Sequence, residues 1–294
     1  MSLPSKSDDP KLFKMLLKRP SIAWPTLLLL VSAYGIFSLT LLAYSDAALS
    51  LPWVILWNSI ASYMAFTVAH DGTHNAISTN QHVNDWAGRA AIALLEPGPF
   101  FKVFRFIHMR HHQYTNDPEK DPDTYCGHGP AWVMPLRWLS LDVIYFKTYL
   151  QKENFSKSKK AEKIEFFLCL IFAILVISTV TLLGLLEAYL LLFFIPTRIA
   201  KLFIVFGFDF LPHYPHKITV KENRYQCTSN RVGLEWLLTP LFISQNYHLV
   251  HHIYPSVPFY RYLKIWNARL DYHNAKKPAI TDTFAITPKV KNNT

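Results

Sequence analysis

The stretch Asn246-Tyr-His-Leu-Val-His-His252 places three histidines close together near the end of a 294-residue chain. Residues three and four positions apart share one face of a helix, so His248, His251 and His252 would aim their imidazoles at one point. Two similar clusters lie upstream, formed by His70 and His74 and by His108, His111 and His112. Several imidazoles directed at one point are typical of a transition-metal site.

The composition predicts the environment of these clusters. Hydrophobic residues make up 51% of the chain and aromatic residues 15%, and the apolar residues gather in four long runs. Runs of about 20 apolar residues are long enough to cross a bilayer as helices. We therefore expect an all-α integral membrane protein, a single domain over residues 1–294, with spans at 22–44, 51–69, 164–183 and 185–206.

Short connections pair these spans. The turn at 45–50 joins the first two runs and the turn at 184–187 joins the last two, which predicts two transmembrane hairpins. Residues 86–106 are interrupted by Pro97 and Pro99 and are interpreted as an interfacial or re-entrant helix. Residues 131–150 are expected to form an amphipathic helix at the lipid headgroups. The remainder of 70–163 and 207–294 is expected to form a cap outside the membrane.

Charge predicts the orientation. The net charge is +10, but neither hairpin turn contains Lys or Arg. By the positive-inside rule, both chain ends and the cap are cytoplasmic, and all three histidine clusters lie on that side. The same distribution favours an anionic membrane surface as the origin of the basic balance, and we expect no nucleic-acid partner.

Eight clustered histidines exceed the coordination of one ion, because a first-row metal has at most six positions and needs an open one to react. Two metal ions are therefore implied. Imidazole binds zinc, copper and iron alike, so the ligand type leaves the element open. Cys126, Cys169 and Cys227 are scattered and odd in number, which argues against a disulfide framework and a cysteine-bound zinc.

The order H-x-x-x-H, H-x-x-H-H, H-x-x-H-H across four spans resembles the membrane fatty acid desaturase superfamily. Within it, residues 111–123, 211–213 and 245–256 are most similar to bacterial β-carotene ring hydroxylases and their relatives. The resemblance implies two Fe ions, O2 as co-substrate and a lipid substrate whose unactivated C–H bond is oxidised. Because the chain has no flavin, nicotinamide or haem motif, a ferredoxin or cytochrome b5-type protein is expected to supply the electrons.

The resemblance also implies a further histidine between the last span and the third cluster. His213 fits this place, and His216 competes with it. Asp209 stands one helical turn before His213, where a polar residue is expected to reach the metal through water. The remaining histidines, His82, His128 and His273, match no motif and are expected at the surface or the membrane interface.

Residues around the ligands are expected to orient them through hydrogen bonds. Asp71 stands between His70 and His74, and Asn246 stands two residues before the third cluster; both are assigned this role. For the acidic run, two interpretations stay open: contact with the outer nitrogen of a ligating imidazole, or a turn with capping carboxylates. The run consists of Asp117, Glu119, Asp121 and Asp123.

Two substrate classes and two other classes of protein remain open at this stage. One of these is a structural or lipid-binding membrane protein, which would behave independently of O2 and tolerate loss of the histidine clusters. A fatty acyl desaturase or hydroxylase fits the pattern, with a carotenoid ring hydroxylase as the alternative, and no catalytic residue separate from the metal ligands is expected. A histidine-rich membrane protein that binds or transports metal would also gather imidazoles. Such a transporter should carry ionisable residues within its spans, whereas here, apart from Glu165 and Glu187 at the beginnings of two spans, only Arg198 and Lys201 fall there.

Overall fold

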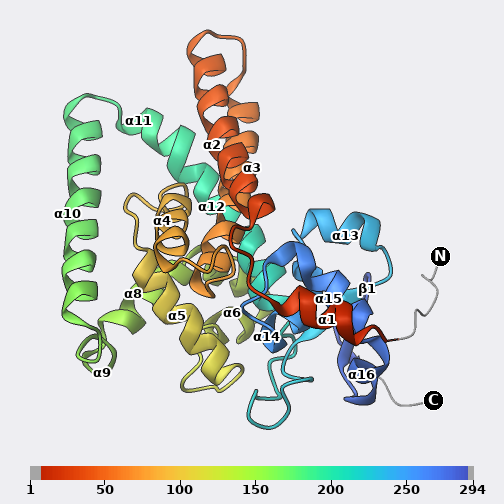
Figure 1. The fold of residues 1–294 in the computed structure, drawn as a ribbon. Coiled ribbons are helices and arrows are strands. Elements are labelled where there is room, and N and C mark those ends of the chain that lie inside the picture. Colours follow the sequence, from red (N-terminus) through yellow and green to blue (C-terminus); the bar gives the residue numbers. More distant parts are fainter. Residues whose placement is uncertain (1–7, 291–294) are drawn as a thin grey trace.

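The computed structural model describes residues 8–290 and is built mostly of helices (Figure 1). Four of them are long and apolar enough to cross a membrane: Trp24–Ser45 (α2), Leu51–Thr73 (α3), Lys160–Leu182 (α10) and Leu186–Phe210. These bounds agree with the expected spans to within a few residues, except that α3 continues to Thr73 and so includes His70. The predicted cytoplasmic location of the chain ends falls in part on residues 1–7 and 291–294, outside the described residues.

The last span changes its winding along its length. It consists of α11 (Leu186–Tyr189), a π-helical segment (Leu190–Phe194), α12 (Ile195–Ile204) and a second π-helical segment (Val205–Phe210). Pro196 has no N–H, so the carbonyl of Leu192 four residues earlier loses its helical donor. The side-chain amide of Asn58 on α3 donates to that carbonyl at 2.7 Å. Asn58 therefore ties the two helices together at a break that the sequence creates.

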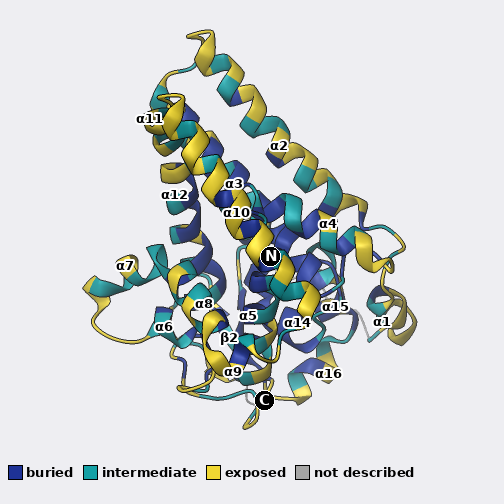
Figure 2. Cartoon of the chain, turned by 90° about the vertical axis from the view of Figure 1, so that its left-hand side faces the viewer, coloured by how far each residue is buried: buried dark blue, intermediate teal, exposed yellow. Residues whose placement is uncertain are grey.

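α2 and α3 pack along each other as an antiparallel pair (Figure 1). Small residues such as Ala33, Ala61 and Ala65 are fully buried in this contact, which allows the backbones to approach closely. α10 is different, because it stands away from this pair and most of its surface is exposed (Figure 2). Its buried Phe166 and Cys169 pack in a cluster with Phe100 that contains no residue of the last span. The pairing of α10 with the last span as a second hairpin therefore stays a prediction.

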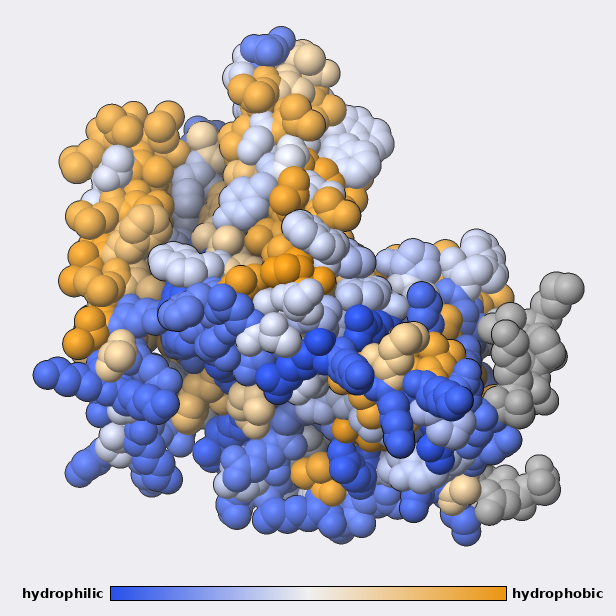
Figure 3. All heavy atoms as spheres, viewed as in Figure 1, coloured by the Kyte–Doolittle hydropathy of each residue, from blue (hydrophilic) through white to orange (hydrophobic). Residues whose placement is uncertain are grey.

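The surface divides into two zones. Apolar side chains cover the projecting helices, and hydrophilic side chains cover the broad base (Figure 3). Side chains such as Leu39, Leu168 and Leu182 are exposed on α2 and α10. An exposed apolar zone of this size marks a surface that does not face water, which agrees with the four apolar spans.

The base contains most of the remaining helices, and two of our expectations for it were wrong. Residues 86–106 form parts of two helices, Gln81–Ile92 (α4) and Phe101–Tyr114 (α5), because Pro97 and Pro99 prevent a continuous helix. Residues 131–150 form three pieces: Ala131–Val133 (η1), Met134–Leu139 (α7) and Leu141–Leu150 (α8). The short helices Pro10–Leu17 (α1), Thr124–Gly127 (α6) and Lys152–Phe155 (α9) also belong to the base.

The C-terminal part corrects the all-α expectation, because it contains a small three-stranded sheet. Ser229–Val232 (β1) pairs in parallel with Ala279–Asp282 (β2), which pairs antiparallel with Lys289–Val290 (β3). Strands this short carry too little alternation to be read from the sequence. The surrounding helices are Glu235–Leu241 (α13), Gln245–Tyr247 (η4), His248–Ile253 (α14), Phe259–Arg261 (η5), Tyr262–Ala268 (α15) and Leu270–Ala275 (α16).

A hydroxyl between α2 and α3 provides a test of this packing. Thr40 donates to Asn58 at 2.5 Å, so Thr40→Val would leave the buried Asn58 carbonyl oxygen without its donor. We expect a loss of about 1 kcal/mol, the range found for polar contacts between membrane helices, and a fall of about 2–4 °C in the unfolding temperature in detergent. Thr181→Val is the matched control, because the Thr181 hydroxyl bonds only the Ile177 carbonyl of its own helix. Equal melting temperatures for both variants would contradict the role of this contact.

Candidate metal centre

Nine histidines converge where three helices and one turn meet. His70 lies in the last turn of α3 and His74 at its end, α5 carries His108, His111 and His112, α14 carries His248, His251 and His252, and His213 lies in the turn after the fourth span. Eight of these side chains are buried, and only His112 is partly exposed. Residues nearly two hundred positions apart in the chain thus form one cluster.

The nine imidazoles divide into two groups of four with one between them. The first group is His70, His74, His108 and His251, and the second is His111, His213, His248 and His252. In each group one ring nitrogen per residue lies within 4.8 Å of all the others. His112 lies between them, within the same distance of His251 and His252. The second and third clusters each contribute to both groups, because neighbouring helical residues point in different directions.

The separations between nitrogens fit ligands of a common ion. The Nε2 atoms of His70 and His251 are 3.1 Å apart, and that of His213 is 3.0 Å from that of His248. His112 Nε2 lies 2.8 Å from His251 Nε2. Two nitrogens bound at right angles to an ion at about 2.1 Å are about 3.0 Å apart. The residues present therefore fit a pair of metal ions.

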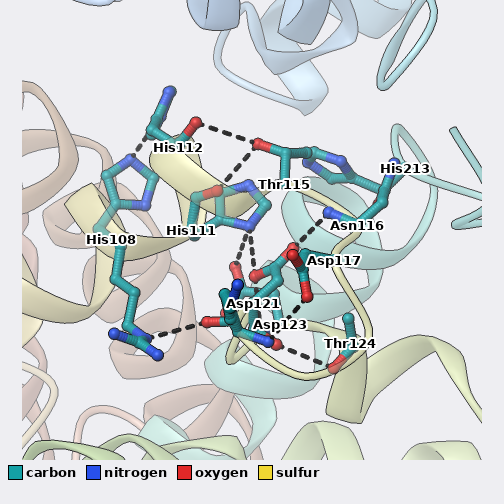
Figure 4. Close-up of polar contacts among 12 residues, drawn as sticks. His108, His111, His112, Thr115, Asn116, Asp117, Asp121, Asp123, Thr124 and His213 are labelled. Carbon is teal, nitrogen blue, oxygen red and sulfur yellow. Dashed lines mark hydrogen bonds and ion pairs between the residues drawn. The ribbon is translucent and has the colours of Figure 1, made fainter. Parts of the chain in front are cut away.

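The outer nitrogens of three imidazoles have partners that fix their orientation. Nδ1 of His111 lies 3.0 Å from Asp121 and 3.1 Å from Asp123 (Figure 4). A carboxylate only accepts, so this nitrogen carries the hydrogen and leaves Nε2 free for a metal. Nδ1 of His248 lies 2.8 Å from the side-chain oxygen of Gln245, and Nδ1 of His251 lies 3.1 Å from the hydroxyl of Tyr262.

Electrostatics keeps most of the cluster neutral. Burial, reinforced by neighbouring imidazoles, holds the pKa of His108, His248 and His252 well below the usual value, as it does for His112, His213 and His251. Neutral imidazole is the form that binds metal. His111 differs: burial opposes its charge, but Asp121 and Asp123 outweigh burial and raise its pKa to about 9. Binding of a metal at its Nε2 would therefore release a proton.

The acidic run follows both of the interpretations that the sequence left open. Asp121 and Asp123 contact His111, and Asp121 also accepts from the backbone N–H of Asn116 at 2.7 Å. Asp117 instead accepts from the backbone N–H groups of Glu119 and of the residue after it, which is a capped turn. The two carboxylates deepest in the loop thus serve the cluster, and the first one shapes the loop.

Two other expected partners contact no histidine in the structure. The carboxylate of Asp71 accepts from the hydroxyl of Thr26 at 3.0 Å and from the backbone N–H of Phe259 at 3.4 Å. One residue after His70, it is rotated by about 100° around the helix and points to α2. Asn246 donates to the carbonyl of Arg231 rather than to a ring. The residue before it, Gln245, contacts His248 and so has the orienting role that we had predicted for Asn246.

Asp209 and the remaining histidines complete the comparison with the sequence. Among residues 8–290, no hydrogen bond joins the Asp209 side chain to another residue, so its role through water stays a prediction. His213, not His216, belongs to a histidine group. His82 and His128 are exposed, as expected. The surface position expected for His273 was wrong: it is fully buried and stacks on Trp266 with ring centroids 4.7 Å apart.

Sequence reasoning missed Gln245 and Tyr262. Gln245 left a usable signal, because it stands three residues before His248 and therefore on the same side of the turn. Tyr262 left none, because its approach to His251 depends on how α15 packs against α14. Tyr262 is fully buried, so its hydroxyl needs a partner there.

An apolar cavity of about 80 Å³ lies near the histidines. Two of its wall residues touch the first group: Phe104 stacks on His108 with centroids 5.7 Å apart, and Phe66 lies 6.2 Å from His70. A third wall residue, Tyr145, donates to Asp123 at 2.7 Å and so connects the cavity to the partner of His111.

Removal of one carboxylate from His111 should weaken metal binding. We expect Asp121→Asn and Asp123→Asn each to reduce the affinity for Fe(II) by about 10–100-fold, the usual effect of losing the partner of a ligating imidazole. Asp117→Asn is the matched control, since its carboxylate contacts only the loop backbone. The measurement is bound metal per chain during titration with a competing chelator. An equal loss of affinity in the Asp117 variant would assign the effect to loop folding.

Comparison with known proteins identifies the family. The family described as Fatty acid desaturase matches residues 47–281. Similar proteins include the dihydrorhizobitoxine desaturase of Bradyrhizobium elkanii, 27% identical over 69% of this chain and 63% of the relative. An sn-1 oleoyl-lipid 12-desaturase of Synechocystis sp. is 32% identical over 35% of this chain and 28% of the relative.

A carotenoid enzyme is also among the similar proteins. A beta-carotene ketolase of Paracoccus sp. is 27% identical over 70% of this chain and 74% of the relative. The chain spans less than two-thirds of the length of the first two relatives. The match to the family nevertheless covers most of the sequence and contains all nine converging histidines. The chain therefore belongs to the fatty acid desaturase family.

Proposed function

We propose that the protein is an integral membrane oxidoreductase that uses O2 and two iron ions to attack an unactivated C–H bond of a lipid. The observation that carries this proposal is the position of the two histidine groups beside an apolar cavity. Each group offers four neutral or deprotonable imidazoles, and Phe66 and Phe104 belong both to the cavity wall and to the surroundings of His70 and His108.

The bound iron pair would supply the activation of O2 and the transfer of electrons. The residues of the chain have three tasks around it. The imidazoles hold the ions and leave positions open, Asp121 and Asp123 fix the ring of His111, and the aromatic cavity wall excludes water from the substrate carbon. Electrons come from outside, and we propose a ferredoxin or cytochrome b5-type donor.

The proposed orientation places the histidines in the cytosol. Four spans form two hairpins, both chain ends face the cytosol, and the hydrophilic base is the cytosolic cap. This arrangement is supported by the absence of Lys and Arg from the turns at 45–50 and 184–187. It is also supported by the position of the clusters at the end of α3 that is remote from the first turn.

The proposed substrate is a lipid with a long apolar chain. The cavity walls are mainly aromatic and aliphatic, which suits a hydrocarbon segment. A fatty acyl chain is the first candidate, and a carotenoid is the alternative. The similar proteins include an oleoyl-lipid desaturase and a beta-carotene ketolase, one for each class of substrate. Either insertion of oxygen or loss of a second hydrogen is compatible with this cavity, since the choice depends on the placement of one substrate carbon.

A metal transporter fits the packing less well. The two cations within the last span are neutralised by residues of the base: Arg198 bonds Asp142 at 2.6 Å, and Lys201 bonds both Asp142 and Glu96. They form a closed cluster of two positive and two negative groups. A transport path would instead need polar groups distributed along the spans.

The proposal is tested by lipid analysis of a host that expresses the chain, together with iron analysis of the purified protein. We expect a new unsaturated or oxygenated lipid that depends on O2, and about two irons per chain. His251→Ala combined with His252→Ala should abolish both, because one ligand of each group is lost. His82→Ala is the control, since His82 is exposed and outside the cluster. Less than about one iron per chain, unchanged in the double variant, would refute the proposal.

A further inference from the structure

The metal cluster has one partly exposed ligand. Of the nine converging histidines, His112 alone is not buried, and its Nε2 lies 2.8 Å from His251 Nε2 and 3.2 Å from His108 Nε2. It also lies within the ligand distance of His252, so it touches both groups. Its ring is therefore a direct connection between the surface and both proposed ions.

His112 forms part of the wall of a large surface hollow. The hollow lies between the outer face of α5, α9 and the beginning of α10, and Met109 and Gln113 are exposed beside His112. A second depression continues it, because both are lined by Arg110, Tyr114, Asn154 and Lys157. We call the combined surface the basic hollow. Its basic residues are Lys102, Arg105, Arg110, Lys120, Lys152 and Lys157.

The basic hollow keeps a net positive charge. Lys102 and Arg105 share the carboxylate of Asp85. Within residues 8–290, no ion pair involves the other four basic residues. The acidic residues in the same lining are Glu119, Glu153 and Glu162, half as many as the basic ones. A concave surface of one dominant charge attracts a partner of opposite charge.

We propose that the basic hollow docks an acidic one-electron carrier protein, and that electrons enter the metal pair through the imidazole of His112. This inference rests on the proposed function, which requires an external reductant. Met109 is exposed in the same lining and provides an apolar contact among the charged residues, as protein interfaces usually do.

The electron count needs two carrier molecules for each turnover. Each reduced carrier gives up one electron and leaves oxidised, and two such transfers in succession take two Fe(III) to two Fe(II). A small, electrostatically steered interface suits this sequence, because each oxidised carrier must leave before the next one binds. Complementary charge raises the rate of encounter by about 10–1000-fold at low ionic strength without requiring tight binding.

An anionic lipid surface is the competing occupant, because the basic residues near α10 lie close to the expected membrane boundary. Lipid headgroups would account for Lys152 and Lys157. They would not account for a histidine that lines the same hollow and contacts both histidine groups. The position of His112 favours the electron carrier.

The test measures reduction of the iron-loaded protein in nanodiscs by stopped-flow absorbance. Two probes are used, an acidic [2Fe–2S] ferredoxin and the soluble domain of a cytochrome b5, each prereduced. In Lys152→Glu combined with Lys157→Glu, we expect the rate with the effective carrier to fall by about tenfold or more at low salt. The wild-type rate should fall as ionic strength rises, and the dependence should weaken or reverse in the variant.

Lys264→Glu combined with Lys276→Glu is the control, because it makes the same change of charge on exposed residues of α15 and α16, away from α9 (Figure 1). Its rates should stay within about twofold of wild type, since a remote charge is screened. Iron content and reduction by dithionite should be equal in all three proteins. These two readouts belong to the metal centre, so their absence from wild type would refute the proposed function and not the docking surface.

Three outcomes would overturn the docking proposal while leaving the metal centre intact. The first is equal carrier-dependent reduction in wild type and the Lys152/Lys157 variant. The second is an equal loss in both double variants, which would indicate an effect of net charge alone. The third is binding of phosphatidylserine vesicles that the Lys152/Lys157 variant loses while carrier-dependent reduction is unchanged, which would assign the hollow to lipid.

Discussion

The mutual approach of buried imidazole lone pairs is the constraint on which this structure depends. Nε2 atoms face each other at 2.8–3.4 Å throughout the cluster. For His111, whose Nδ1 is held by acceptor-only carboxylates, Nε2 is the metal-binding nitrogen. A neutral imidazole has one N–H and one acceptor nitrogen, so a crowded cluster of imidazoles cannot pair all of its nitrogens, and each buried polar atom without a partner costs about 1–3 kcal/mol. A positive ion between the nitrogens would convert this cost into bonds, so the packing of the base fits the binding of cations.

The apolar helices hold the ligands at the required separation. α3 carries His70 in its last turn, and Asn58 fixes this helix to the last span through the carbonyl that Pro196 releases. The last span in turn leads directly into His213. A polar bond deep among apolar helices thus sets the relative position of ligands from two spans. Within an apolar environment such a bond has no competition from water, which makes it a positional device as well as a source of stability.

Most residues of the candidate site could be predicted from the sequence, because the spacing of residues along a helix is a local property. The three clusters followed from positions along the chain, the four spans followed from apolar runs, and His213 followed from the resemblance to the family, whereas the two ions stay a prediction. The parts that could not be predicted depend on packing between distant elements. His273 has no motif and is buried only because α16 folds against Trp266, and Asp71 was misassigned because sequence proximity to His70 hides the rotation between adjacent helical residues. The short strands are likewise fixed by partners about 50 residues apart.

α5 is an amphipathic helix that lies between the proposed substrate cavity and the proposed docking surface. Phe104 forms part of the wall of the apolar cavity, while Met109, on another side of the helix, lines the basic hollow. His108 and His111 are buried near the side of Phe104, and His112 is partly exposed and lines the basic hollow. A substrate chain and a water-soluble protein need opposite environments, and a helix with two faces can offer both within one diameter of about 10 Å. The i, i+3, i+4 spacing of the second cluster therefore does more than gather ligands: it places the metal pair at the boundary between the two surfaces.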